Sequence, residues 1–176
     1  FKYKLKYIYT IMSYVTNQLI NTNLNINSNE LTKDIDALIL HKLKEKYENI
    51  CTQHGYVVEG TISLINRELG NVKTIDSNSY ISYVVNYSAD IIYPTEGEII
   101  DVIVDRVNKM GVISYVDNPK NNFESSPLII IVPNEYFTES TRDINSITKN
   151  QKIKVEILSV RIKYGNSKIQ IIAKPL

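Results

Sequence analysis

The sequence predicts an α+β domain, with one helix against a small antiparallel sheet, followed by an all-β barrel of five strands. Three observations lead to this prediction. The first half of the chain holds its one clear amphipathic helical pattern. The second half holds five short apolar stretches separated by turn residues. Between them, residues 93–97 (YPTEG) break the apolar pattern, which predicts domains at 1–93 and 94–176.

In the first domain, residues 14–26 alternate loosely, so we expect a short strand and then an extended turn. Ser28 or Asn29 then offers an N-cap oxygen to a helix that should end near Asn49. Apolar residues recur at three- and four-residue spacing along one face of this helix: Leu31, Ile35, Leu38, Ile39, Leu43 and Tyr47. Short strands follow at 56–65, where Gly60 suggests a bulge, and at 72–75 and 80–87.

In the second domain, strands are expected at 98–107, 112–116, 128–132, within 153–162, and at 168–172, with one helical turn at 133–137. In the fourth strand, the apolar alternation shifts by one residue after Ile157, at Leu158. Such a shift predicts a β-bulge, which bends a strand around a small barrel. Five strands with a helical turn after the third are the pattern of an OB-type barrel.

Composition excludes several classes of protein. Hydrophobic residues make up 43% and charged residues 22% of the 176, which is ordinary globular usage. The longest unbroken apolar run, 128–132, is far shorter than the roughly 20 residues of a membrane-spanning helix. Cys51 is the only cysteine, so an intrachain disulfide and a cysteine zinc site are excluded, and a reducing intracellular compartment is expected. Glycine-rich phosphate loops are also missing, so we expect no nucleotide cofactor.

The residues offer no convincing catalytic or metal centre. His41 and His54 have no nucleophile at a spacing that favours a triad, so surface or capping roles are expected for both. Asp101 and Asp105 would lie on one side of a strand but roughly 13 Å apart, too far for one metal ion. Cys51 is expected to be buried and structural. We therefore expect no enzyme activity from this chain alone, and neither a metal nor a cofactor.

Three segments together resemble the stalk subunit family of multisubunit DNA-directed RNA polymerases, which is called the seventh subunit in eukaryotes and has an archaeal counterpart. They are residues 42–58 (KLKEKYENICTQHGYVV), 85–104 (VNYSADIIYPTEGEIIDVIV) and 108–111 (NKMG). The resemblance runs from about residue 12 to about residue 172 and implies a tip domain followed by an S1-type OB barrel. Residues 1–11 lie ahead of it, and their role is open.

The resemblance implies a non-catalytic subunit that docks on the polymerase core near the clamp. Its partners would be the largest subunit, a sixth-subunit-like protein and a fourth-subunit-like stalk partner, with nascent RNA as a further ligand. An apolar face of the tip domain or linker would then await a partner. The residues expected to dock on the core surround the Gly-Tyr turn: Thr52, His54, Gly55, Tyr56 and Gly60.

Charge suggests where RNA would bind. Residues 94–148 carry four basic and nine acidic residues, whereas 149–176 carry seven basic residues against Glu156 alone. OB barrels commonly bind oligonucleotides through the loops after strands one and four. We therefore expect RNA on one basic edge formed by five residues: Lys109, Arg161, Lys163, Tyr164 and Lys168. An ordinary polar hairpin tip is the alternative interpretation of this edge.

Departures from the family leave a second function open. The strand at 112–116 lacks the aromatic residues of RNA-stacking S1 domains, and Pro133 and Asn134 stand where many such domains have a histidine. A stand-alone S1/OB protein of RNA decay or translation is therefore the alternative. The A/T-rich codon usage implied by abundant Ile, Asn, Lys and Tyr suits a large DNA virus. The expected location is then a cytoplasmic virus factory or the virion, and the nucleus for a cellular protein.

Overall fold

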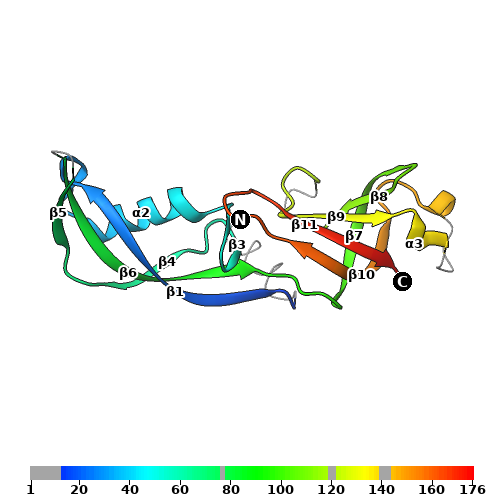
Figure 1. Cartoon of the computed structure of the whole chain (residues 1–176), viewed down its shortest axis with the longest axis horizontal. Helices are drawn as coiled ribbons and strands as arrows, with labels where there is room; N and C mark the ends of the chain where they lie inside the picture. The colour runs from blue at the N-terminus through cyan, green and yellow to red at the C-terminus, as the bar shows by residue number, and fades with distance from the viewer. Residues whose placement is uncertain (1–12, 76–77, 119–121, 139–143) are drawn as a thin grey trace. The chain divides into compact units, whose positions relative to one another are not determined.

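The structure is a computed structural model that describes residues 13–75, 78–118, 122–138 and 144–176 (Figure 1). The described chain divides into two compact units. One holds residues 16–49 and 57–91, and the other holds 50–56 and 92–176 together with 13–15. This grouping puts residues 50–56 with the barrel, whereas the sequence interpretation put them in domain 1–93. The functional division at residue 93 stays a prediction, and residues 1–11 lie outside the described part.

The first unit is a helix packed on an antiparallel sheet. Strand β6 (Asn78–Ile92) pairs with β1 (Val15–Asn27), β4 (Ser63–Arg67) and β5 (Asn71–Ile75). Helix α2 (Ile35–Tyr47) covers one face, and its buried Ile39 and Leu43 meet apolar side chains from β1 and β6. On β6 the apolar and polar residues alternate, so one face builds the core and the other carries Asn86 and Asp90. The predicted helix-on-sheet architecture is confirmed.

Helix α2 begins later than the sequence predicted. Residues Ser28–Glu30 form a separate 3-10 turn, η1, and the helix starts after Asp34. The Asp34 carboxylate accepts the backbone N–H of Ala37 at 3.0 Å, which makes Asp34 the N-cap in place of Ser28 or Asn29. Leu31 consequently lies outside the helix and is 38% exposed. The end is close to the prediction, because the Glu48 N–H closes the last turn on the Lys44 carbonyl.

Three strand predictions in the first half were wrong in extent, among them the strand at 80–87, which is the fifteen-residue β6. Strand β1 is thirteen residues long, rather than a short strand and an extended turn. The expected strand at 56–65 is two strands, β3 (Gly55–Val57) and β4, with Gly60 in the turn between them. Gly60 has φ +74°, its N–H donates to the Glu48 carboxylate at 3.0 Å, and the Thr61 hydroxyl donates to the Val58 carbonyl. These local hydrogen bonds favour a turn over a bulge.

The second unit contains a closed barrel of five strands. They are β7 (Ile99–Asn108), β8 (Gly111–Tyr115), β9 (Leu128–Pro133), β10 (Lys152–Arg161) and β11 (Ile169–Pro175). Their order is β10-β11-β9-β8-β7, and β10 pairs back onto β7 to close the barrel. Strands β9 and β11 are parallel, and the short helix α3 (Glu135–Thr138) follows the third strand. The predicted OB-type barrel is therefore confirmed.

The predicted bulge lies where the alternation shifts. The β10–β11 register slips between Ile157 and Ser159, so Leu158 is the extra residue. A second slip, between Val104 and Arg106 of β7, was not predicted. The short hairpin of β2 (Cys51–Thr52) with β3 is grouped mainly with this unit. A second 3-10 turn, η2 (Ile144–Ser146), precedes β10.

The family-like junction Tyr-Pro-Thr-Glu-Gly-Glu is tied to the barrel by hydrogen bonds. The Gly97 N–H donates to the Ile157 carbonyl, and the Ile157 N–H donates to the Glu98 carbonyl, both at 2.8 Å. The Glu98 carboxylate accepts the Thr95 N–H at 2.7 Å and the Ser13 hydroxyl at 3.0 Å. The motif therefore has a structural role, because it fixes where the chain enters β7.

Gly111→Ala should strongly destabilise the barrel, and Gly165→Ala serves as its matched control. Both glycines have positive φ, but a Cβ at Gly111 would collide with the Val132 carbonyl and Pro133, whereas a Cβ at Gly165 meets open space. We expect a loss of about 2–4 kcal/mol at Gly111, from backbone strain plus overpacking, and about 1 kcal/mol at Gly165. Urea unfolding of the full chain measures both, and equal losses would contradict the packing argument.

Candidate nucleic-acid interface

The turn between β10 and β11 presents the exposed part of the predicted RNA site. Arg161, Lys163 and Tyr164 are exposed, and the Tyr164 side chain is 71% accessible. The Asn166 N–H closes the turn on the Lys163 carbonyl at 3.1 Å, and Gly165 supplies the positive φ of +81°. An accessible tyrosine beside two cations can take a base on its ring and phosphates beside it.

This turn is anchored to Cys51, which the sequence did not predict. The Cys51 N–H donates to the Asn166 carbonyl at 2.7 Å, and the Gly165 N–H donates to the Cys51 carbonyl at 2.9 Å. Both backbone groups of Cys51 are thereby satisfied by a turn more than a hundred residues further along the chain. The turn after β10 is therefore fixed to the start of the β2–β3 hairpin by two backbone hydrogen bonds.

The Lys168 side chain is half-buried against Phe123. Its ammonium donates to the Phe123 carbonyl at 2.8 Å and lies 4.6 Å from the centroid of the Phe123 ring. Partial burial lowers the pKa of Lys168, and the nearby charge of Glu124 opposes that shift. The Arg106 guanidinium lies 5.6 Å from the same centroid, and Tyr115 meets the ring edge-on. Lys168 therefore joins two loops and is a poorer phosphate ligand than Arg161 or Lys163.

The sequence interpretation missed Phe123 and Arg106. The one available signal was a lone aromatic residue in the polar loop after the second barrel strand. Arg106 also forms an ion pair with its neighbour Asp105 at 3.1 Å. Beneath this cluster, burial raises the pKa of the Tyr115 hydroxyl, and the charges of Asp105 and Asp117 add to the effect. The cluster around Phe123 thus contains two cations, Arg106 and Lys168, with the carboxylates of Asp105 and Asp117 nearby.

Lys109 lies at the opposite end of the barrel from the other four predicted RNA residues. Lys109 occupies the turn after the last residue of β7. Strand β10 runs antiparallel to β7, with Glu156 paired to Ile99 at the start of β7, and Arg161 lies five residues further along β10, past that start. The ten residues of β7 separate the two ends, on the order of 30 Å. One contiguous basic edge is therefore not formed. In its own turn, the Asn108 side chain accepts the Met110 N–H at 3.0 Å, which explains the Asn-Lys-Met-Gly motif.

Ion pairs consume part of the positive charge of residues 149–176. Lys152 pairs with Asp117 at 3.3 Å, and Lys174 pairs with Glu156 at 3.0 Å. For Arg161 and Lys163, the described residues provide no ion-pair partner within 4.0 Å. The turn after β10 is therefore where cations remain available to a ligand beside an exposed aromatic ring.

The residues predicted to dock on the core mostly build the turn itself. Thr52, Gly55 and Tyr56 are buried, His54 is half-buried, and Gly60 is exposed. The Thr52 hydroxyl donates to the Gly55 carbonyl and accepts the His54 N–H, both at 3.1 Å. Their role in docking stays a prediction, and the structure gives three of the five an internal role.

Cys51 is fully buried, as predicted. Burial raises the pKa of its thiol to about 11, so the group is a protonated, unreactive thiol near neutral pH. In the described residues, no group of three or more His, Cys, Asp and Glu side chains is placed to hold a metal ion. Nor does any described helix have the length and apolar character needed to cross a membrane.

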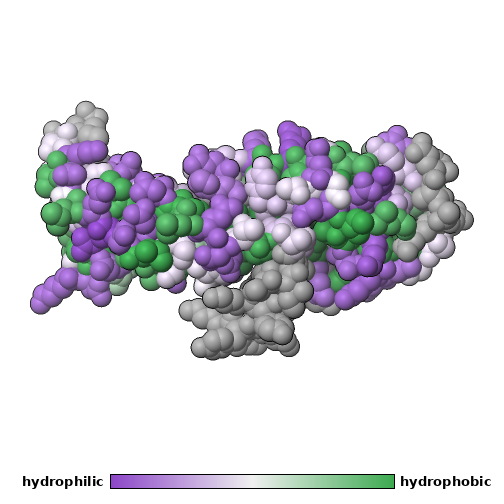
Figure 2. Space-filling model, turned by 90° about the horizontal axis from the view of Figure 1, so that it is seen from below, coloured by the Kyte–Doolittle hydropathy of each residue, from purple (hydrophilic) through white to green (hydrophobic). Residues whose placement is uncertain are grey.

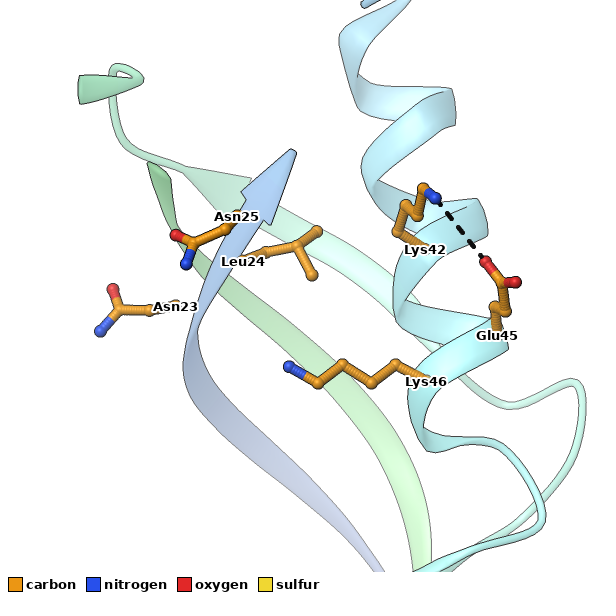
Figure 3. A pocket seen from close by; sticks show the side chains of 6 residues that line it. All are labelled: Asn23, Leu24, Asn25, Lys42, Glu45 and Lys46. Carbon is orange, nitrogen blue, oxygen red and sulfur yellow. Dashed lines mark ion pairs between the residues drawn. The ribbon is translucent and has the colours of Figure 1, made fainter. Parts of the chain in front are cut away.

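A shallow hollow lies between β1 and α2 (Figure 3). Asn23 and Asn25 line it from the strand, and Lys42, Glu45 and Lys46 line it from the helix. Lys42 pairs with Glu30 at 3.0 Å and with Glu45 at 3.9 Å, and its hydrogen bond lowers the pKa of Glu30. Lys46 lies over the Tyr47 ring. Because these internal contacts engage both Lys42 and Lys46, we assign no ligand to the hollow.

The fold defines the class of protein: an OB-barrel protein with an additional helix-on-sheet unit. Its similarity to known proteins is narrower. The chain is 26% identical over 153 residues to the DNA-directed RNA polymerase II subunit RPB7 of Glycine max, covering 86% of this chain and 83% of that protein. With the Dictyostelium discoideum rpb7 subunit it shares 24% over 136 residues, 72% and 75% of the two chains.

A viral protein is similar to the same extent. An RNA polymerase subunit of Acanthamoeba polyphaga mimivirus is 24% identical over 152 residues, which cover 84% of this chain and 74% of the viral one. A search against protein-family models gave no match. The resemblance to the stalk subunit family of multisubunit DNA-directed RNA polymerases is thus confirmed, since proteins named as its seventh subunit align with most of this chain.

The buried Cys51 thiol predicts a loss of stability at alkaline pH. Because the folded pKa of about 11 lies above the ordinary value of 9.0, the stabilisation is complete below pH 9 and is lost as the pH rises through 11. The free energy of unfolding should therefore fall between pH 9 and 11 more in the parent than in Cys51→Ala, by no more than about 3 kcal/mol. Parallel pH profiles of the two proteins in denaturant unfolding would show that the thiol contributes nothing.

Proposed function

We propose that this chain is the non-catalytic stalk subunit of a multisubunit DNA-directed RNA polymerase. The observation that carries the proposal is the similarity to RNA polymerase II seventh subunits, which spans most of the chain and both of its units. The OB-type barrel and the helix-on-sheet unit support it, since both are the parts that the family resemblance implied. Nucleotide addition would then belong to other subunits of the enzyme.

In this proposal, the unit with helix α2 and the Thr52–Tyr56 turn of the barrel unit dock on the polymerase core near the clamp. The partners are the largest subunit and a sixth-subunit-like protein, together with a fourth-subunit-like protein of the stalk. His54 and Gly60 are the docking residues that reach the surface. The enzyme works in the nucleus if the source is cellular, and in a virus factory or virion if it is viral, as the mimivirus relative suggests.

Copurification tests membership of the polymerase. The full chain carries an affinity tag in its source cells, the complex is purified in moderate salt, and its proteins are identified by mass spectrometry. We expect the two largest polymerase subunits in amounts comparable to the tagged chain. A tagged chain that is monomeric and free of polymerase subunits would instead support the stand-alone RNA-binding protein.

Nascent RNA contacts the turn after β10 in this proposal. Arg161 and Lys163 supply charge without an internal ion pair, and Tyr164 supplies a stacking surface. The anchor to Cys51 holds this turn in one conformation, so less ordering entropy is lost when RNA binds. Lys168 contacts Phe123 and is not counted among the RNA ligands. Lys109 lies too far away to contact the same RNA segment.

The salt dependence of RNA binding tests this site. Removing two phosphate contacts with Arg161→Ala and Lys163→Ala together should flatten the log–log salt slope by about 1.4. Tyr164→Ala should weaken binding by about 1–3 kcal/mol with an unchanged slope, because stacking carries no charge. Fluorescence anisotropy with oligo(U) measures both, and Lys109→Ala is the matched control for loss of one exposed lysine. If the double variant keeps the parent's slope, RNA does not bind at this turn.

A further inference from the structure

Strand β1 forms one edge of the sheet in the first unit. The order of that sheet is β1-β6-β3-β2, with β4 and β5 also on β6, so among the described strands β1 pairs with β6 alone (Figure 1). The thirteen residues of β1 extend over roughly 43 Å. Its side away from β6 therefore presents a long row of backbone N–H and C=O groups to which a second strand can bind.

Strand β1 lacks the features that usually protect an edge strand from pairing. Protected edges are commonly short or carry charged residues or proline. The sequence of β1, VTNQLINTNLNIN, contains no charged residue, no proline and no glycine. The edge is therefore open to another strand, and no charge on β1 repels one.

Hydrogen bonds define which residues of β1 face this free edge. They join three pairs of residues across the two strands: Tyr14 to Tyr93, Asn17 to Asp90, and Asn21 to Asn86. Each step forward on β1 equals a step back on β6, so the strands are antiparallel and in one register through these pairs. The Tyr93 N–H donates to the Tyr14 carbonyl, so even-numbered residues of β1 direct their backbone groups to β6. The odd-numbered residues direct theirs to the free edge.

A row of asparagine side chains ends at the same edge. The Asn21 amide donates to Asn86 of β6 at 2.8 Å, and the Asn86 amide donates to Asn66 of β4 at 2.7 Å. A carboxamide has two N–H donors and one acceptor oxygen. After its bond to Asn86, Asn21 keeps one N–H and its oxygen for a further partner. An amide placed opposite Asn21 on an added strand would continue the row.

The side chains beside the edge favour recognition by hydrogen bonds. The odd-numbered residues from 17 to 25 are all exposed, and four of the five are asparagines, with Leu19 as the fifth at 70% exposure. Figure 2 shows hydrophilic and hydrophobic residues interspersed over the surface of the first unit. Backbone groups and amides, rather than apolar area, therefore supply most of what a partner can bind here.

Strand β1 is complementary to a second copy of itself. Asn21 is the middle residue of Val15–Asn27, so antiparallel pairing about a two-fold axis at Asn21 aligns two β1 strands over their full length. This pairing places Asn21 opposite Asn21 and Asn17 opposite Asn25, with the outward backbone groups of both strands facing each other. The opposed amides exchange hydrogen bonds, and no like charges meet.

We propose that the free chain forms a symmetric dimer by antiparallel pairing of two β1 strands, centred on Asn21. The pairing covers both free edges at once and joins the two asparagine rows into one that crosses six strands. It does not rest on the proposed function, because it concerns the chain outside the polymerase. Its failure would leave the proposed membership of a polymerase untouched.

Sedimentation equilibrium of the full chain tests the proposal. The parent should form a dimer that dissociates on dilution. Asn21→Lys and Asn21→Asp should each weaken dimerisation by about fivefold or more, because like charges then meet at the axis. An equimolar mixture of these two variants should recover dimers, since opposite charges then meet. Asn66→Lys is the matched control and should dimerise as the parent does, because Asn66 ends the asparagine row on β4, away from the free edge.

Leu19→Pro tests the backbone contribution. Proline removes the N–H of residue 19, which faces the free edge, and spares the hydrogen bonds to β6. It should weaken dimerisation more than Leu19→Ala, which shortens the side chain but keeps the N–H. Circular dichroism checks that each variant is folded. Recovery in the mixture of Asn21 variants is a further check, because misfolded chains would not regain dimers on mixing.

Three results would overturn the proposal: a parent that is monomeric at every concentration, a dimer that Asn21→Lys leaves unchanged, or a mixture of the Asn21 variants that stays monomeric. A photo-crosslinking residue at position 19 identifies the other possible occupant. If the free chain is monomeric and this residue crosslinks to another subunit in the purified polymerase, the edge binds a strand of that subunit instead.

Discussion

Closure of the barrel by β10 is the constraint on which the rest of the second unit depends. This strand pairs with β11 on one edge and with β7 on the other, and it must bend to reach both. The extra residue Leu158 lies within the β10–β11 pairing, just beyond the last residue paired with β7, and provides that bend. Hydrogen bonds from Gly97 and Glu98 to Ile157 then fix the start of β7 beside the bulge. The one-residue bulge at Leu158 thus lies beside both the closing strand pairs of the barrel and the point where the chain enters β7.

The same strand determines what the barrel shows to a partner. Because no edge is left unpaired in it, the barrel offers side chains and loops, not backbone, for recognition. The loop after β10 is held by Cys51, and the loop after β8 is held by Lys168 through Phe123. Each long loop near this end is therefore secured by a residue distant in sequence. Anchoring of the turn after β10 favours binding there, because less order remains to be imposed on it.

Features encoded by periodicity were predictable from the sequence, and features made by distant contacts were not. The apolar stripe of α2, the five barrel strands and the bulge at Leu158 follow from residue spacing alone. The helix start was wrong because several polar residues could cap it, and the Asp34 side chain did so. The anchor at Cys51 and the Lys168–Phe123 contact join residues separated by 45 positions or more, and no local pattern encodes such pairs.

Charge counted along the sequence overstates the positive surface, and this limits the strength of the proposed RNA contact. Lys152 neutralises Asp117 of the acidic segment, Lys174 neutralises Glu156, and Lys168 is held on Phe123. At the turn, Arg161 and Lys163 remain, enough for about two phosphates, so binding there is weak and sensitive to salt. Weak contacts of this kind suit the proposed function, because a tight site would hold a growing transcript.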